Sequence, residues 1–495
     1  MVVASGKGYR VRQRTGCKYA DGRRVPVEGG YIGSIIDGKF VPDNTIKKTG
    51  STGRVDIKNY GRVMYCDILN RDILNMLAPF YNDAESAMIY SIAMIRACYP
   101  GTRDYQILSL YRESFVSEMY PGQNMGKNAV SIEQRNLGLE YSRIRNFMKA
   151  RVCSMSDNDT IIIDGCLIQN HSSIDTLSQI SRKTKARKHK GSLIIYAYSE
   201  DLREPVCSKL YQGNMVDSRS IGDFLGTNGI SKGLIVTDKG FTAEMVTEAT
   251  KGKKDLHYLV PLKRNSLLIR DNSMYDFDGV FFDEERIEFK KVLCNGFWLY
   301  SFRNLSIAKD EEESYLEEHA ECMNPEELKE ARRGFGTLVF QCDMDIPPSK
   351  VYSIYQNRWL IELLFKFYQT EMDFDDTRVH DDYSDIGSAF IDFLAALMGS
   401  RLLNAFGNCA DMRYWTFKAS MDFLDRLKMV RIGDENDWEM NRLPATDAEL
   451  FAKLGLIGKP IVPVEIKKKG RPKGRKDTVT RKTRSDKGSK RKSVA

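Results

Sequence analysis

The sequence has no cysteine pair at Cys-x-x-Cys spacing among its 10 cysteines. Its 5 histidines show neither the His-Glu-x-x-His pattern nor paired Cys/His spacing. These absences disfavour a structural zinc site, a dithiol redox centre and a zinc hydrolase. Scattered cysteines without such a pattern indicate a reducing compartment. We therefore expect free thiols and structural histidines.

Long apolar runs are also missing. The N-terminus has no apolar core ahead of a small-residue cleavage site, so no secretory signal is visible. The most apolar stretch, residues 386–406, is interrupted by Asp392 and Arg401. Charged residues at those positions favour a buried helix over a membrane span. These features predict a cytoplasmic protein.

Charge is unevenly distributed along the 495 residues, a length that predicts two to four domains. The formal net charge is +8, but residues 466–495 carry +12 and residues 1–54 carry +7, which leaves −11 for the middle. Basic ends around an acidic body suit a protein that binds a polyanion with its ends and holds clustered carboxylates at its centre. The alternative is that the ends are only solvated and disordered.

Two aspartates follow predicted strands. Short β-branched runs at residues 160–163, 192–197, 233–237, 256–260 and 337–341, with a helical run at 242–251, predict an α/β domain with a mixed sheet. Asp164 directly follows the first run and Asp238 the third. Catalytic groups favour the carboxyl ends of strands, although a single Asp there is more often a turn former or helix cap.

A third acidic residue lies in a predicted helix over residues 349–372. Tyr355, Arg358, Glu362 and Lys366 fall at offsets 0, 3, 7 and 11, which places all four on one helix face. Taken alone, this pattern also fits a surface helix whose cations merely flank Glu362 as weak ion pairs.

Together the three pieces resemble the DDE transposases of bacterial insertion sequences, in the group with a Tyr-Arg-Glu-Lys signature. The order of the acids and their separations of 74 and 124 residues are similar to that family, and further likeness lies in residues 30–33, 213–217 and 387–397. One position departs from the pattern. The family's lysine lies seven residues after the glutamate, where this chain has Gln369, so Lys366 is the alternative source of a cation.

The resemblance implies a ribonuclease-H-like catalytic domain in which Asp164, Asp238 and Glu362 hold two Mg²⁺ or Mn²⁺ ions. It also implies that Tyr355 and Arg358 contact DNA phosphate near the cut, that a homodimer assembles on transposon-end DNA, and that the protein associates with the bacterial nucleoid. The chemistry of phosphodiester cleavage supports a two-metal site independently of the resemblance. Phosphodiester cleavage is served by two metals about 3.5–4 Å apart, and hard oxygen ligands select Mg²⁺ or Mn²⁺.

Two other features predict DNA contacts. Residues 469–476 resemble an AT-hook, in which Arg471 enters the minor groove with Lys473 and Arg475 beside it. A generic polybasic tail is the alternative. Trp298 is a candidate stacking platform for an unpaired base, with a strand-core tryptophan as the alternative.

The predicted fold class is multi-domain α+β, with a ribonuclease-H-like domain that carries a β-rich insertion and follows a helical domain. The predicted segments are a basic N-terminal arm or small β module at 1–60, a helical DNA-binding domain at 61–155, the catalytic domain at 156–263 and 336–410, the insertion at 264–335, a C-terminal helical region at 411–465 and a disordered basic tail at 466–495. A transposase is the predicted function. A non-catalytic DNA-binding relic and a nuclease of the same fold that cuts without joining are the alternatives.

Overall fold

The structure described below is a computed structural model. It divides into two compact units, residues 1–443 and 444–495, of which the second contains helix α16 (Ala445–Lys453). The predicted tail with Arg471, Lys473 and Arg475 lies outside the described residues. The structure describes residues 2–5, 8–20, 22–36, 39–42, 55–170, 172–181, 190–215, 217–319, 324–372, 374, 376–377, 379–433 and 437–458.

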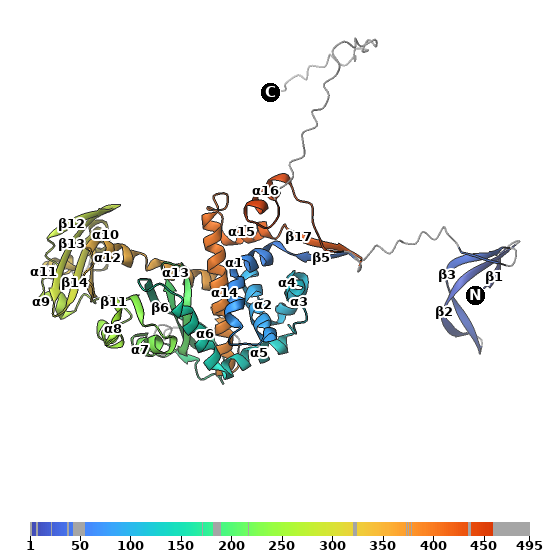
Figure 1. The fold of residues 1–495 in the computed structure, drawn as a ribbon, viewed down its shortest axis with the longest axis horizontal. Coiled ribbons are helices and arrows are strands. Elements are labelled where there is room, and N and C mark those ends of the chain that lie inside the picture. Colours follow the sequence, from blue (N-terminus) through green and yellow to red (C-terminus); the bar gives the residue numbers. More distant parts are fainter. Residues whose placement is uncertain are drawn as a thin grey trace, which may run out of the picture. The chain divides into compact units, whose positions relative to one another are not determined.

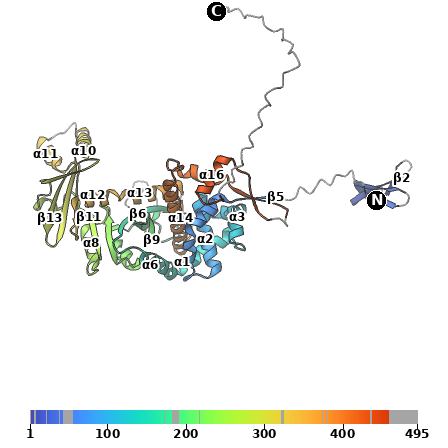
Figure 2. The same cartoon turned by 45° about the horizontal axis from the view of Figure 1, so that its top comes forward.

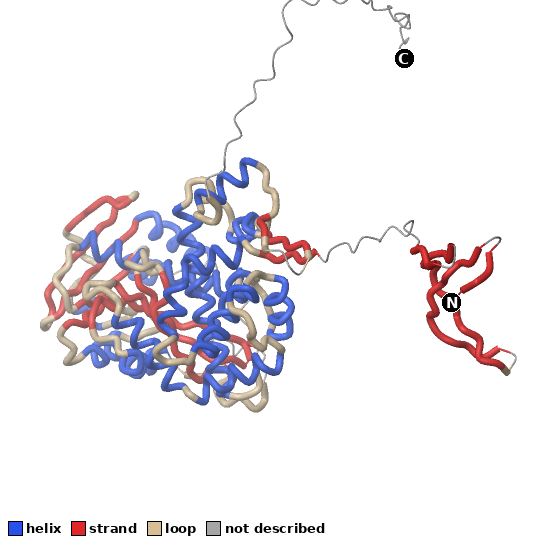
Figure 3. Tube along the Cα trace, turned by 45° about the vertical axis from the view of Figure 1, so that its right-hand side comes forward, coloured by secondary structure: helices blue, strands red, loops and turns tan. Residues whose placement is uncertain are grey.

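The N-terminal segment forms a four-stranded antiparallel sheet of order β1-β2-β3-β4 (Figure 3). Its strands are β1 (Val2–Ser5), β2 (Gly8–Ala20), β3 (Arg23–Ile36) and β4 (Lys39–Pro42). Gly22, with φ of 71°, turns the chain between the two long strands. Arg10, Arg12 and Arg14 lie on β2, and its pairing with β3 shifts register between Val11 and Arg12, between Arg12 and Arg14, and between Arg14 and Gly16.

Six helices follow, as the apolar spacing of this segment predicts: α1 (Gly61–Leu77), α2 (Asp83–Cys98), α3 (Asp104–Glu113), α4 (Val116–Met119), α5 (Lys127–Leu139) and α6 (Tyr141–Cys153). Helix α2 begins with a capping box, in which the Asn82 side chain accepts from the Glu85 backbone N–H and the Glu85 side chain accepts from the Asn82 N–H. The chain turns at Glu140 between α5 and α6.

Helix α14 (Asp382–Asn408) is the central helix of the fold and packs against α5, α2, α1 and β9 (Figure 1). Among the described residues it is the one helix long and apolar enough to cross a membrane, and 78% of its most apolar window is buried inside the structure. It approaches α5 closely, since a Cβ on Gly387 would meet the Gln134 carbonyl oxygen at 1.8 Å and one on Gly138 would meet the Tyr383 oxygen at 1.9 Å. As predicted, this apolar stretch is a buried helix.

The large sheet has the ribonuclease-H-like arrangement that the resemblance implies. The strands β6 (Thr160–Asn170), β8 (Lys190–Ser199) and β9 (Glu204–Gln212) are antiparallel neighbours. On the other side of β6 lie β10 (Lys232–Thr237) and β11 (Asp255–Pro261), both parallel to it. The spatial order β9-β8-β6-β10-β11, with β8 reversed, confirms the predicted fold class. Helices α7 (Asp217–Asn228) and α8 (Ala243–Thr250) connect these strands.

The predicted β-rich insertion extends this sheet. Strands β12 (Gly279–Asp283), β13 (Glu285–Cys294) and β14 (Phe297–Asn304) join it through β15 (Thr337–Cys342), which pairs with β11. With the two-residue strands β7 (Gln179–Ile180) and β16 (Asp376–Thr377), the sheet has 11 strands. The segment also holds α9 (Leu267–Asp271), α10 (Leu305–Glu318) and α11 (Pro325–Gly334).

The helix predicted over residues 349–372 is broken, and that prediction is wrong. The structure has α12 (Pro348–Gln356), α13 (Trp359–Lys366) and the π-helical turn η2 (Phe367–Glu371). Figures 1 and 2 show α12 and α13 as separate consecutive helices. Asn357, at the break, donates its side-chain amide to Glu200 Oε1 at 2.5 Å, so a tertiary contact holds the chain where the local sequence favours a continuous helix.

The segment predicted as a C-terminal helical region contains strands as well as helices. It holds α15 (Phe417–Leu424), β17 (Lys428–Ile432) and β18 (Glu439–Met440). Strand β17 pairs antiparallel with β5 (Val55–Asn59), so residues 55–59 form a three-stranded sheet with the C-terminal part of the first unit.

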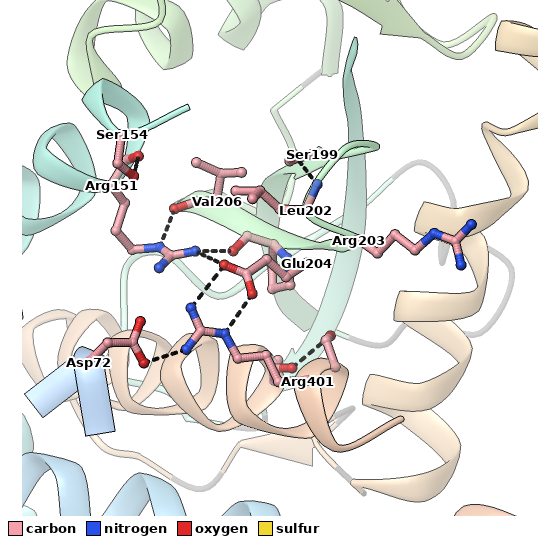
Figure 4. A network of polar contacts seen from close by, with 12 residues as sticks. Asp72, Arg151, Ser154, Ser199, Leu202, Arg203, Glu204, Val206 and Arg401 are labelled. Atoms are coloured by element: carbon pink, nitrogen blue, oxygen red, sulfur yellow. Dashed lines mark hydrogen bonds and ion pairs between the residues drawn. The ribbon is translucent and has the colours of Figure 1, made fainter. Parts of the chain in front are cut away.

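A buried ionic network joins α6, β9, α14 and α1 (Figure 4). Glu204 accepts from Arg151 Nη2 at 2.9 Å and from Arg401 Nε at 2.6 Å, and Arg401 also reaches Asp72 Oδ1 at 2.6 Å. The Arg151 and Glu204 side chains are only 4% and 8% exposed. Because a buried charge needs compensation, this network fixes the helices to β9 of the large sheet.

Candidate active site

Asp164 on β6 and Asp238, which directly follows β10, occupy matching positions beside neighbouring parallel strands. Ile163 of β6 lies opposite Thr237 of β10, and the next residue on each chain is the aspartate. Parallel neighbours lie about 4.8 Å apart. Ile163 and Thr237 are fully buried, so both aspartates follow rigid, buried strand positions.

Asp164 does not end its strand, and that prediction is wrong. Strand β6 continues to Asn170 because its antiparallel pairing with β8 persists through Gln169, beyond the point where its pairing with β10 stops. Asp164 therefore lies where β6 loses one neighbour and keeps the other. Its Oδ1 accepts from the Gly165 N–H at 2.7 Å.

Asp238 begins a tight turn. The Phe241 backbone N–H donates to the Asp238 carbonyl at 3.0 Å, and the Phe241 side chain is buried. The buried phenyl ring and the turn hydrogen bond fix the loop, while the Asp238 side chain stays 40% exposed. A polar group can therefore approach this carboxylate from solvent.

Glu362 is linked to Asp238 through Arg358. Arg358 Nη2 lies 2.6 Å from Glu362 Oε1, and its Nη1 lies 3.9 Å from Asp238 Oδ1. The guanidinium carbon lies 5.5 Å from the centre of the Tyr355 ring. The structure thus brings Tyr355, Arg358 and Glu362 together with Asp238, as the sequence predicts, although the helix that carries them is broken.

The charges in this cluster affect one another. Burial raises the pKa of the Tyr355 phenol, while the Arg358 guanidinium lowers it and the Asp238 and Glu362 carboxylates raise it. Burial by itself would lower the pKa of Arg358, but Tyr355, Asp238 and Glu362 raise it overall. Arg358 therefore remains a fixed positive charge between two acids.

Helix α13 lies over the face of the sheet from which Asp164 projects. Tyr196 of β8 lies opposite Asp164 and so shares its face, and the Tyr196 ring contacts Phe365 of α13 with a centroid distance of 5.9 Å. Cys166, two residues after Asp164, has its Sγ 2.9 Å from Gln369 Nε2. These contacts place the helix of Glu362 against the strand of Asp164.

Three site residues were missed by sequence reasoning. Asn357 and Glu200 hold the break before Arg358, and Cys166 receives the side chain of Gln369. Gln369 occupies the position of the family's lysine. A long-range contact such as Asn357 to Glu200, across 157 positions, has no local sequence signal.

The remaining predicted residues are spread more widely. Lys366 is exposed on α13. Trp298 lies on β14 opposite Leu293 and Cys342, and the Lys291 ammonium lies 4.4 Å from the centre of its indole ring. His257 Nδ1 pairs with Asp343 at 3.0 Å and His319 stacks on Tyr315, whereas His171 and His189 lie outside the described residues.

The donor chemistry of the site fits a hard divalent cation. Asp164, Asp238 and Glu362 supply only carboxylate oxygens, the ligands that Mg²⁺ and Mn²⁺ prefer. Within the ranges that the structure describes, however, no three His, Cys, Asp or Glu side chains are arranged so that they could hold a metal. Glu362 instead pairs with Arg358.

Comparison with known proteins identifies this region. Residues 155–383 match the family described as "Transposase DDE domain". This segment is a DDE-type transposase domain. The DDE domain contains Asp164, Asp238 and Glu362, and the predicted resemblance is confirmed.

A cryo-EM structure titled as a piggyBac transposase synaptic complex with hairpin DNA resembles the chain with a TM-score of 0.39 and 10% identity. The likeness covers 74% of this chain and 80% of that one. No curated protein matches the sequence.

Proposed function

We propose that this protein is a transposase that binds transposon-end DNA and catalyses phosphodiester cleavage and strand transfer through Asp164, Asp238 and Glu362. One observation carries the proposal. Within the DDE domain, Ile163 of β6 pairs with Thr237 of β10, so Asp164 and Asp238, the next residues, are neighbours. Arg358 contacts both Asp238 and Glu362.

The three carboxylates would hold two Mg²⁺ or Mn²⁺ ions. Such a pair activates an attacking water or 3′-hydroxyl and stabilises the leaving oxygen. The protein's part is to present carboxylates from rigid strands, which Ile163 and Thr237 support by their complete burial. Asp238 and Glu362 are 40% and 54% exposed, so DNA can reach them.

Arg358 and Tyr355 would contact the phosphate. A guanidinium can donate two hydrogen bonds to two phosphate oxygens, and Arg358 is already positioned beside two of the three acids. The Tyr355 ring lies against the guanidinium and limits its freedom. These two residues would orient the scissile phosphate.

Other basic surfaces would bind the rest of the duplex. Arg10, Arg12 and Arg14 lie on β2 of the N-terminal sheet, and β-ribbons are an established way to contact a DNA groove. Residues 466–495 carry +12. Both features favour binding to phosphate without sequence selection, since phosphate contacts position a protein and carry no sequence information directly.

The decisive experiment is a strand-transfer assay with the purified full-length protein, Mg²⁺, a plasmid carrying the gene with its flanking DNA, and a second target plasmid. Joined donor–target products support the transposase. Cleavage without joining would instead indicate a nuclease of the same fold. Binding without cleavage or joining would indicate a non-catalytic relic, and size-exclusion chromatography with light scattering of the DNA complex tests the proposed homodimer.

A further inference from the structure

The positively charged Arg358 side chain lies between the carboxylates of Asp238 and Glu362. Its two terminal nitrogens face different carboxylates, Nη2 at 2.6 Å from Glu362 and Nη1 at 3.9 Å from Asp238. The Arg358 side chain is only 18% exposed, whereas those of Glu362 and Asp238 are 54% and 40% exposed. The Arg358 side chain is therefore more buried than those of the two acids.

This arrangement opposes metal binding by the same oxygens. An Mg²⁺ ion needs a carboxylate oxygen at about 2.0–2.1 Å, and Glu362 Oε1 already accepts a charge-assisted hydrogen bond from Arg358, which holds the orientation of the whole carboxylate. The positive guanidinium also repels a second cation placed nearby.

The guanidinium also has a donor that nothing satisfies. Arg358 Nε is buried and has no hydrogen-bond partner among the described residues. A buried donor without a partner costs free energy, which a ligand with several acceptor oxygens can recover. A phosphate that approaches the exposed acids presents such oxygens, and its negative charge attracts the guanidinium.

We propose that Arg358 is an internal counter-ion that holds Glu362 away from the metal. Arg358 leaves Glu362 when its guanidinium pairs with a DNA phosphate instead. Metal and DNA then bind with positive coupling, because each favours the state in which Arg358 has left Glu362. By linkage, DNA tightens metal binding by the same factor as metal tightens DNA binding. The inference rests on the proposed function, since it assumes that Glu362 and Asp238 are metal ligands.

The test is the affinity for Mn²⁺, measured by isothermal titration calorimetry on the full-length protein with and without a duplex from the DNA that flanks the gene. Without DNA, Arg358→Ala and Arg358→Gln should bind Mn²⁺ about tenfold more tightly than the wild type, the factor expected when a competing charged hydrogen bond of about 1.5 kcal/mol is removed. The duplex should tighten Mn²⁺ binding for the wild type and leave both variants nearly unchanged.

Arg332→Ala is the matched control. It removes the same charge from another Arg–Glu pair, with Glu312, on the exposed surface of α11, and it should behave as the wild type. Unchanged or weaker Mn²⁺ binding by both Arg358 variants, with folding verified by circular dichroism, would overturn the inference, as would an equal effect of DNA on wild type and variants. A wild type that binds no Mn²⁺ even with DNA would overturn the proposed function and this inference with it.

Discussion

Ile163 of β6 lies opposite Thr237 of β10, and each is followed by an aspartate. This relationship turns two acids 74 positions apart into neighbours without any side-chain contact between them being needed. Because the backbone pairing of buried strands sets the geometry, the positions of Asp164 and Asp238 depend on the stability of the sheet. Contacts far from the site therefore affect it through the fold.

The Glu204 network is the first such contact. Replacing Glu204 by Ala leaves the Arg151 and Arg401 guanidinium groups without their shared partner, and Arg151 is buried. Breaking a buried pair in this way costs about 3–5 kcal/mol. We expect a loss of that size in the free energy of unfolding, measured by urea denaturation of Glu204→Ala.

Asp72→Ala is the control for this network. Asp72 also pairs with Arg401, but its side chain is 53% exposed, so its loss should cost at most about 1 kcal/mol. Equal unfolding midpoints for Glu204→Ala and the wild type would show that the network does not stabilise the fold.

The missing family lysine gives a second prediction. Gln369 Nε2 lies beside Cys166, two residues after Asp164 on β6, so Gln369→Lys would place a cation near the acids, and cleavage should be unchanged or faster. If Lys366 replaces the family lysine, Lys366→Ala should slow cleavage substantially. Cleavage rates on one duplex test both variants. Wild-type activity of Lys366→Ala would show that Lys366 does not take the role of the family lysine.

The free energy of unfolding should decrease as the pH rises, because Asp385 is buried. Burial raises the pKa of this carboxyl to about 8, with the Ser192 hydroxyl opposing the shift and Asp175 adding to it. Between about pH 4 and pH 8 the folded state holds a proton that the unfolded chain has released. The free energy of unfolding therefore falls by up to about 1.4 kcal/mol per pH unit in that window.

Asp385→Asn keeps an acceptor for the Ser192 hydroxyl but cannot ionise, so it should flatten this dependence. The measurement is thermal unfolding of wild type and Asp385→Asn between pH 5 and pH 8, with the exposed Asp271→Asn as control. A variant whose melting temperature falls with pH as steeply as that of the wild type would assign the effect to another group.

The basic tail gives a prediction outside the described residues. Deleting residues 466–495 removes +12, so it should weaken binding to any duplex and flatten its salt dependence, since each phosphate contact adds about −0.9 to the log–log slope. If the tail acts as an AT-hook, Arg471→Ala should lose more affinity for A·T-rich than for G·C-rich DNA. Fluorescence anisotropy across a salt series measures both effects, and an unchanged slope after truncation would show that the tail does not contact DNA.

Much of the site could be predicted from local patterns. The β-branched runs before Asp164 and Asp238 are strands, and the spacing of Tyr355, Arg358 and Glu362 does bring these side chains together. These features depend on residues a few positions apart, where sequence periodicity reports structure directly.

The failures concern contacts between distant segments. The break at Asn357 depends on Glu200, the extension of β6 past Asp164 depends on β8, and the pairing of β5 with β17 joins segments more than 350 positions apart. In each case tertiary pairing overrides the local preference. An ion pair between Arg358 and Glu362 is what the alternative interpretation, a surface helix, predicts. The structure shows this ion pair and places Arg358 beside Asp238 as well.

The central claim is that Asp164, Asp238 and Glu362 bind the catalytic metal, and replacement by cysteine tests it most directly. A thiolate is a soft ligand that binds Mg²⁺ poorly and accepts softer ions such as Mn²⁺ or Cd²⁺. We predict that Asp164→Cys, Asp238→Cys and Glu362→Cys lose cleavage in Mg²⁺, retain DNA binding, and regain cleavage in Mn²⁺ or Mn²⁺ with Cd²⁺, while the corresponding alanine variants stay inactive in every metal. Cysteine variants that cleave normally in Mg²⁺, or alanine variants that recover with the softer ions, would contradict it.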